Sequence, residues 1–140
     1  MANLLIRGGL VYDAVHETPY VADILCKDGK ISEIAQSIAA PEGCEIINAE
    51  GMNVYPGFVE AHGHLGLDGY GIGYEGADYN EMGDIISPQL RAIDAIKPGD
   101  FALAEAVTGG VTTICTGPGS ANVLGGTFAA IKTVGRRVKT

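Results

Sequence analysis

Two histidines separated by a single residue are the strongest chemical signal in the sequence. His62 and His64 close the stretch 54–64, Val-Tyr-Pro-Gly-Phe-Val-Glu-Ala-His-Gly-His. Alternate side chains of a strand share a face, so we expect both imidazoles and Glu60 on one side. Two imidazoles can bind a divalent metal ion, and a nearby carboxylate can orient them. The spacing therefore predicts half of a metal site, with His62 and His64 as ligands and Glu60 as the orienting carboxylate.

The surrounding residues carry a family resemblance. Residues 56–64 resemble the pattern Pro-Gly-Phe-(Ile/Val)-Asp-x-His-x-His, which closes the first strand of a metal-bearing barrel in the amidohydrolase superfamily. Glu60 departs from this pattern, because many members have Asp there. The departure weakens the assignment of an orienting role to Glu60, but not the family resemblance. A His-x-His pair alone also occurs by chance at surface or core positions, so the context favours metal ligation.

The resemblance implies hydrolysis of a C–N bond, in an amide or a cyclic amide, by a metal-activated water. The implied cofactor is a divalent metal, zinc by expectation, as one or two ions. Two more histidines, an aspartate and often a bridging Lys or Glu would lie on later strands. No catalytic residue is therefore expected within this chain.

Residues 1–53 predict a small all-β module, and the resemblance implies that it is sandwich-like. Strands are expected at 3–12, with a bulge or break at Gly8-Gly9, at 20–27 and at 44–48. Asp28-Gly29 between apolar strands is a strong hairpin signal, because the tight turn needs positive φ. The hairpin Asp28-Gly29-Lys30-Ile31 also resembles the module that precedes the barrel in the superfamily, although a generic β module has the same features.

Residues 54–140 predict a strand–helix–strand unit, and the resemblance implies that they form the first two to three βα units of a TIM-type (β/α)8 barrel. Ser87-Pro88 is typical of a helix start. Asp100 is expected to cap a helix over 101–108 that ends at Gly109-Gly110. The β-branched residues 111–116 then predict a buried strand, parallel to the strand of the histidines. Residues 128–134 fit either a strand or a short helix.

Two loops are expected at the edge of the sheet where the histidines lie. Residues 66–82 are rich in glycine and tyrosine, and Asp68 and Glu75 are candidate contacts for an amine-bearing substrate. The loop 117–122, Gly-Pro-Gly-Ser-Ala-Asn, offers Ser120 and Asn122 as substrate contacts. It lacks the lysine and spacing of a P-loop. A solvated excursion and a simple tight loop are the alternative interpretations.

A narrower resemblance, to the imidazolonepropionase-like group, rests on three stretches. These are the first of the two loops, the segment Ser-Pro-Gln-Leu-Arg-Ala-Ile-Asp at 87–94, and the loop at 117–122.

Composition limits the possible partners. The net charge of −8 argues against nucleic acid or an anionic membrane, and the basic residues at 136–139 are interpreted as a solvated tail. No apolar run reaches the ~18 residues that span a bilayer. Three scattered cysteines without a Cys-x-x-Cys pair indicate a reducing cytoplasm. His16, in a polar loop, is expected at the surface.

A complete barrel takes about 250 residues, so the 140 residues predict a fragment that is inactive alone. The expected partners are a small-molecule substrate and either the remainder of the barrel, a complementary chain or a second copy in a homo-oligomer. Two other functions stay open. One is a non-catalytic interaction module that pairs with a partner chain, and the other is a symmetric oligomer that joins two histidine pairs into one metal site.

Overall fold

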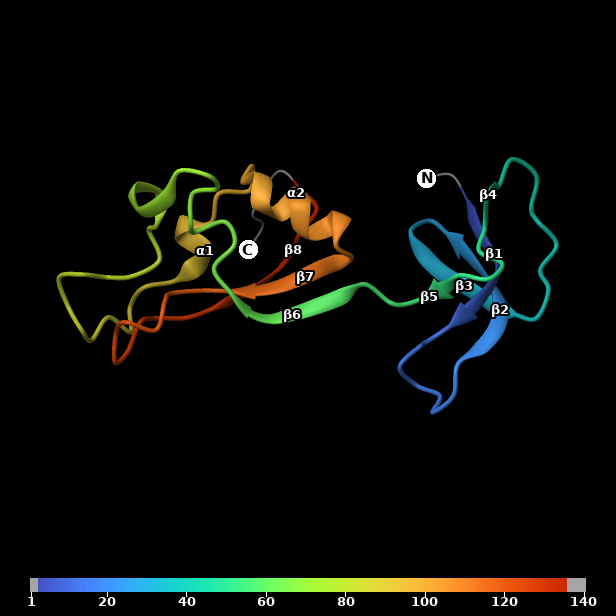
Figure 1. Cartoon of the computed structure of the whole chain (residues 1–140), viewed down its shortest axis with the longest axis horizontal. Coiled ribbons are helices and arrows are strands. Elements are labelled where there is room, and N and C mark those ends of the chain that lie inside the picture. The colour runs from blue at the N-terminus through green and yellow to red at the C-terminus, as the bar shows by residue number, and fades with distance from the viewer. Residues whose placement is uncertain (1–2, 136–140) are drawn as a thin grey trace. The chain divides into compact units, whose positions relative to one another are not determined.

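The computed structural model describes residues 3–135, so the basic residues at 136–139 lie outside the described part. The chain divides into two compact units, Met1–Pro56 and Gly57–Thr140 (Figure 1). The sequence placed a boundary after residue 53, just before the stretch that carries the histidines.

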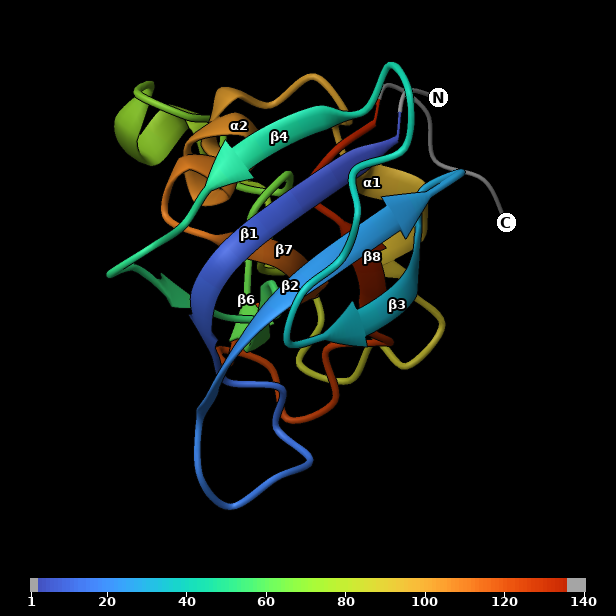
Figure 2. The same cartoon turned by 90° about the vertical axis from the view of Figure 1, so that its right-hand side faces the viewer.

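The first unit is one five-stranded sheet (Figure 2). Its strands are β1 (Leu4–Val11), β2 (Tyr20–Lys27), β3 (Lys30–Ala35), β4 (Glu45–Asn48) and β5 (Asn53–Val54). The order is β3-β2-β1-β4, and β5 also pairs with β1. β1 runs antiparallel to β2 and parallel to β4 and β5. All described helices and strands of this unit are β-strands, but they form a single sheet and not the two sheets of the predicted sandwich.

Two predicted turns have the expected backbone. The β1–β2 register shifts between Ile6 and Gly9, and Gly8 adopts φ 69°, so the glycine pair forms a bulge. Asp28 and Gly29 adopt φ 50° and 75°, which is the pair of positive angles that a tight Asp-Gly hairpin requires.

Apolar side chains pack on both faces of this sheet, and one buried acid ties the sheet to a loop. Leu5, Leu25 and Ile38 form one cluster, and a second cluster forms around Val11, Ala22 and Ile24. Asp23, only 4% exposed, accepts hydrogen bonds from the backbone N–H groups of Gly8 (2.8 Å) and Ile38 (2.9 Å). Its carboxylate therefore joins the bulge of β1 to the loop that carries Ile38.

The second unit contains the predicted strand–helix–strand arrangement. Its sheet has the order β6-β7-β8, with β6 (Phe58–Gly63), β7 (Val111–Thr116) and β8 (Ala129–Lys132). The connection from β6 to β7 contains η1 (Gly73–Gly76), α1 (Ala92–Ala95) and α2 (Phe101–Thr108). β6 and β7 are parallel, as predicted. β8 is a strand, but it runs antiparallel to β7, so only one complete parallel βαβ unit is present among the described residues.

The prediction of a helix that begins at Ser87 is wrong. Arg91 is extended (φ −131°, ψ 124°), and the helix α1 begins only at Ala92. The backbone N–H of Ala92 donates to Thr127 O (3.0 Å), and the N–H of Thr127 donates to Leu90 O (2.9 Å). These bonds to a distant segment replace the first helical turn, because each backbone group satisfied there is withdrawn from a helix.

The helix α2 begins and ends where the sequence predicts. The carboxylate of Asp100 accepts a hydrogen bond from the backbone N–H of Ala102 (2.9 Å), and Gly110 adopts φ 83° just after the helix. Leu103 of α2 and Ile114 of β7 are buried. Within residues 3–135, no helix is long and apolar enough to cross a membrane. His16 is at the surface, as predicted, and pairs with Asp13.

Replacing Asp23 with Ala should lower the free energy of unfolding by about 2 to 5 kcal/mol, because two largely buried N–H groups lose their acceptor. Chemical denaturation followed by circular dichroism measures this change. Glu33→Ala, at an exposed position of β3, is the control and should alter stability by less than about 0.5 kcal/mol. Equal losses in the two variants would contradict the assigned role of Asp23.

Candidate metal and substrate site

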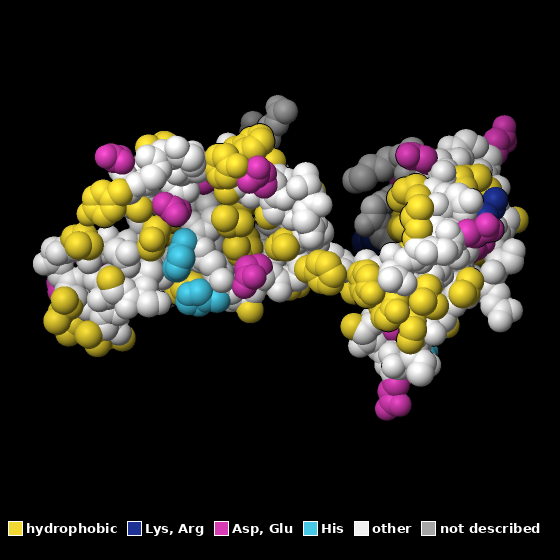
Figure 3. Space-filling view, viewed as in Figure 1, with side chains coloured by type: hydrophobic (Ala, Val, Ile, Leu, Met, Phe, Trp, Pro, Cys, Tyr) yellow, Lys and Arg dark blue, Asp and Glu magenta, His cyan; other side chains and the backbone are white. Residues whose placement is uncertain are grey.

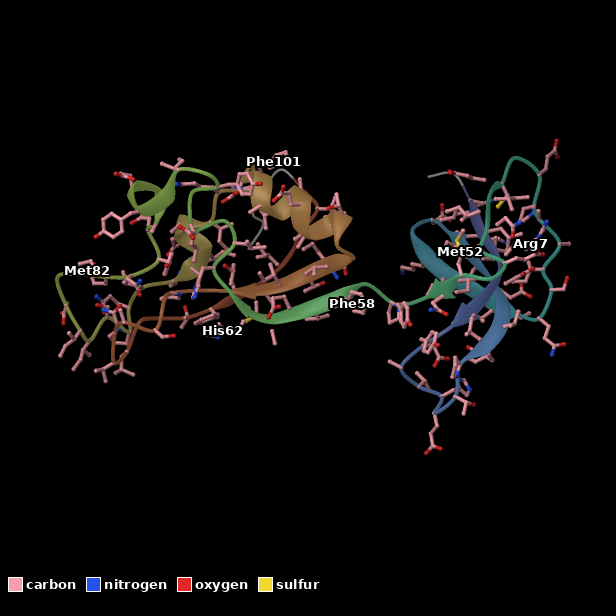
Figure 4. The ribbon with its side chains drawn as sticks, in the orientation of Figure 1. Arg7, Met52, Phe58, His62, Met82 and Phe101 are labelled. Atoms are coloured by element: carbon pink, nitrogen blue, oxygen red, sulfur yellow. The ribbon has the colours of Figure 1, made fainter. Side chains whose placement is uncertain are left out.

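His62 and His64 lie together at the carboxyl end of β6. The centroids of their rings are 5.5 Å apart, and the ring planes meet at 85°. The two histidines appear side by side on the face shown in Figure 3, and Figure 4 labels His62 at the end of the strand. The β6–β7 register shifts between Glu60 and Gly63, so the strand is irregular where His62 stands. Such bulges redirect side chains beside functional sites.

The imidazole of His64 is held by the neighbouring strand. Its Nδ1 lies 2.6 Å from the carbonyl oxygen of Gly117, which follows directly after β7. A carbonyl only accepts, so Nδ1 carries the proton, and Nε2 of the neutral ring keeps its lone pair. Hydrogen bonds also join the two strands at their carboxyl ends. The N–H of Gly117 donates to Gly63 O (3.1 Å), and the Thr116 hydroxyl donates to Leu65 O (2.8 Å). Parallel strands bring both carboxyl ends to one edge, so Gly117 lies beside His64.

Aromatic rings contact both histidines. The ring of Tyr79 stacks on His64 at 4.7 Å, with an angle of 10° between the planes. Phe128, just before β8, lies 5.1 Å from the ring of His62 at a tilt of 44°. Neither aromatic contact was predicted, because Tyr79 comes from a loop without a periodic pattern and residues 128–134 fit either a strand or a short helix.

Glu60 contacts the backbone of His62. Its Oε1 accepts a hydrogen bond from the backbone N–H of His62 (3.0 Å). The carboxylate thus supports the chain at the irregular part of β6. Within residues 3–135, no group of three or more His, Cys, Asp or Glu side chains gathers in a geometry that could hold a metal ion.

A groove of about 940 Å³ opens beside His64, between the loop after β6 and the helix α2. Its chemically functional lining residues are His64, Asp68, Tyr70, Tyr74, Tyr79 and Glu105. A hydrogen bond with Glu105 raises the pKa of Tyr70, because only the protonated phenol can donate to the carboxylate. The groove therefore presents aromatic surface and carboxylates next to a histidine.

The predicted substrate contacts occupy different environments. Asp68 lines the groove, and Glu75 is exposed in η1, whose first residue Gly73 also lines it. Ser120 is exposed on the loop after β7. The Asn122 side chain donates to the carbonyl oxygens of Glu81 (2.7 Å) and Asp84 (2.8 Å), so its amide group joins the two loops.

Sequence reasoning missed Tyr79 and Glu105. Tyr79 lies among the glycines of the first loop, where no spacing rule predicts a stacking partner. Glu105 was interpreted only as a helix-forming residue. The 3.6-residue period of a helix could have identified Glu105, because it shares a face with Ala102 and Ala106, which also line the groove.

No protein-family model matches the chain, whereas individual proteins do. The amidohydrolase tasK of Hapsidospora irregularis is 36% identical over 121 residues, which are 84% of this chain and 12% of that protein. A dihydroorotase of Geobacter sulfurreducens is 43% identical over 63 residues, which are 45% of this chain and 15% of that protein.

Solved structures give the same result. An amidohydrolase from Thermotoga maritima MSB8 matches with a TM-score of 0.87 and 36% identity, covering 96% of this chain and 35% of that one. A D-hydantoinase matches with a TM-score of 0.51 and 29% identity, over 80% of this chain and 19% of that one. The chain thus spans 35% or less of each of these four proteins.

The resemblance of residues 56–64 agrees with these names. None of the four is called an imidazolonepropionase, so that narrower grouping stays a prediction. The superfamily itself is confirmed by relatives in both comparisons: the chain belongs to the amidohydrolase superfamily.

Proposed function

We propose that this chain provides the first two metal ligands and one wall of the substrate groove of an enzyme that hydrolyses a C–N bond in a cyclic amide. The relatives named dihydroorotase and D-hydantoinase support the substrate class, because dihydroorotate and hydantoins are cyclic amides. The observation that carries the proposal is the ring of His64, which lies beside His62 with its Nδ1 hydrogen-bonded to Gly117 O.

The two histidines fit a divalent metal ion. A metal-ligating imidazole typically donates its other N–H to a carbonyl or a carboxylate, and the carbonyl of Gly117 has this position for His64. Zinc is the proposed metal, because it accepts neutral imidazoles readily. When bound, the ion would lower the pKa of a water molecule and polarise the carbonyl of the substrate.

The other residues of the site would orient the substrate. Asp68 and the hydrogen-bonded pair of Tyr70 and Glu105 line the groove, where they can accept or donate hydrogen bonds to a ring amide. Ser120 is exposed on the neighbouring loop. We assign no catalytic base to residues 3–135.

The exposed surface of the second unit supports the need for more protein around it. Within the described residues, β6 and β8 each pair with β7 alone. Phe58 and Val59 of β6 are 54% and 66% exposed, although strands of a parallel barrel are covered on both faces. The proposed barrel would be completed by further strands, whether from the same protein, a complementary chain or a second copy. We therefore expect the 140-residue chain alone to be inactive.

The neutral form of His64 should carry its proton on Nδ1. Two-bond ¹H–¹⁵N NMR correlation spectra distinguish the two ring nitrogens. His64 should give a protonated-type shift at Nδ1 and a lone-pair-type shift at Nε2, because of the bond to Gly117 O. A mixture of tautomers at His64 would contradict the fit to a metal. His62 is the internal comparison, since within the described residues its ring makes aromatic contacts only.

A chimera tests the hydrolase activity. This chain would replace the matching portion of the Thermotoga maritima amidohydrolase, to which it is 36% identical. We expect the chimera to bind zinc and to hydrolyse a cyclic amide such as dihydrouracil or hydantoin. His62→Ala and His64→Ala should each lower the activity at least 100-fold, because a two-histidine half-site loses one of its ligands.

His16→Ala is the matched control, because His16 belongs to the first unit and pairs with Asp13. The metal content of each variant is measured by elemental analysis together with its activity. A zinc-loaded chimera whose activity survives both substitutions would exclude the proposed ligands. Half a metal ion per free 140-residue chain would instead favour a symmetric dimer.

A further inference from the structure

We propose that Tyr79 is a positioning residue for His64. The stacked phenol ring would fix the plane of the imidazole, while the carbonyl of Gly117 fixes its tautomer. This inference rests on the proposed function, because it concerns how one of the proposed metal ligands is held.

A hydrogen bond alone leaves an imidazole free to tilt. The bond from Nδ1 of His64 to Gly117 O fixes one ring atom, but the ring can still rotate about that contact. A parallel aromatic plane at 4.7 Å and 10° restricts this tilt. Productive metal sites need ligand orientations within about 10–20°, so this second constraint matters for binding.

Two parts of the second unit hold Tyr79 in place. Its side chain packs against the buried cluster of Leu67, Ala92 and Ile96. Its carbonyl oxygen accepts the N–H of Gly119 (2.7 Å). The side chain of Tyr79 is thus held by a core cluster, and its backbone is held by the loop that follows β7.

A series of hydrogen bonds joins the loop of Tyr79 to the loop after β7, and we call it the loop clamp. Besides the bond from Gly119 to Tyr79, its members are Ala121 N to Asn80 Oδ1 (3.4 Å), Asn122 Nδ2 to Glu81 O (2.7 Å) and to Asp84 O (2.8 Å), and Val123 N to Ile85 O (2.9 Å). The clamp explains why Asn122 donates both of its amide protons to backbone carbonyls. Its role is to hold Tyr79 in register with His64.

Gly119 allows the two loops to approach closely. A Cβ atom at this position would overlap with the carboxamide of Asn80 and the ring of Tyr79. Gly119→Ala would therefore push Tyr79 away from its present position without removing any functional group. This gives a second route to the same displacement.

The test uses the full 140-residue chain, first without metal. In Tyr79→Leu, the ring-proton resonances of His64 should move downfield, because the ring current of the stacked phenol is lost. Titration with Zn²⁺, followed on the same resonances, should show an affinity about tenfold weaker than that of the wild-type chain. Gly119→Ala should change both readouts in the same direction. Tyr79→Phe keeps the ring, so its affinity should stay within about twofold.

Met82→Ala is the matched control, because its side chain is 82% exposed on the loop of Tyr79 and takes no part in the loop clamp. Unchanged His64 resonances in both Tyr79→Leu and Gly119→Ala would overturn the inference. A tenfold loss in Tyr79→Phe would also overturn it, since the hydroxyl and not the stacked ring would then be responsible. Failure of the proposed function looks different: Zn²⁺ would bind equally well to the wild-type chain and to His64→Ala. The metal-free spectra report on stacking in either case, and they also show whether Tyr79→Leu remains folded.

Discussion

The parallel pairing of β6 with β7 is the constraint on which the candidate site depends. It brings two carboxyl ends to one edge of the sheet, so that a histidine from the first strand meets a carbonyl from the second. The two groups are 53 residues apart in the sequence. Ile114, 1% exposed, anchors β7 at the centre of this pairing. The chemistry of His64 is therefore set by a backbone group of a neighbouring strand.

Much of the fold could be predicted from local physical rules. The Asp-Gly hairpin, the Asp100 cap and the glycine stop after α2 depend on backbone angles and nearby hydrogen bonds, which a short stretch determines. The closeness of His62 and His64 followed from strand alternation, although the register shift beside His62 was not predicted. Rules of this kind work where the deciding contacts are close in sequence.

The errors arise where distant segments meet. The helix expected from Ser87 lost its first turn to hydrogen bonds with Thr127, and the reversal of β8 had no local signal. Tyr79 was seen only as one tyrosine in a glycine-rich loop, because its stacking partner depends on the loop clamp. The hydrogen bonds of Asn122 were also not predicted, since its carbonyl partners lie about 40 residues away, and its role as a substrate contact stays a prediction.

The order of residues along the chain has a consequence for biosynthesis. A ribosome makes a protein from its N-terminus, so the two imidazoles emerge before the groups that orient them. Gly117 appears 53 residues after His64, and Asn122, which ties down the loop of Tyr79, appears later still. A nascent chain that has reached only the first strand of the second unit carries both imidazoles, but His64 still lacks the carbonyl and the stacked ring that hold it. Under the proposed function, selective uptake of an ion would therefore begin only after the second strand and its following loop have been synthesised and have docked.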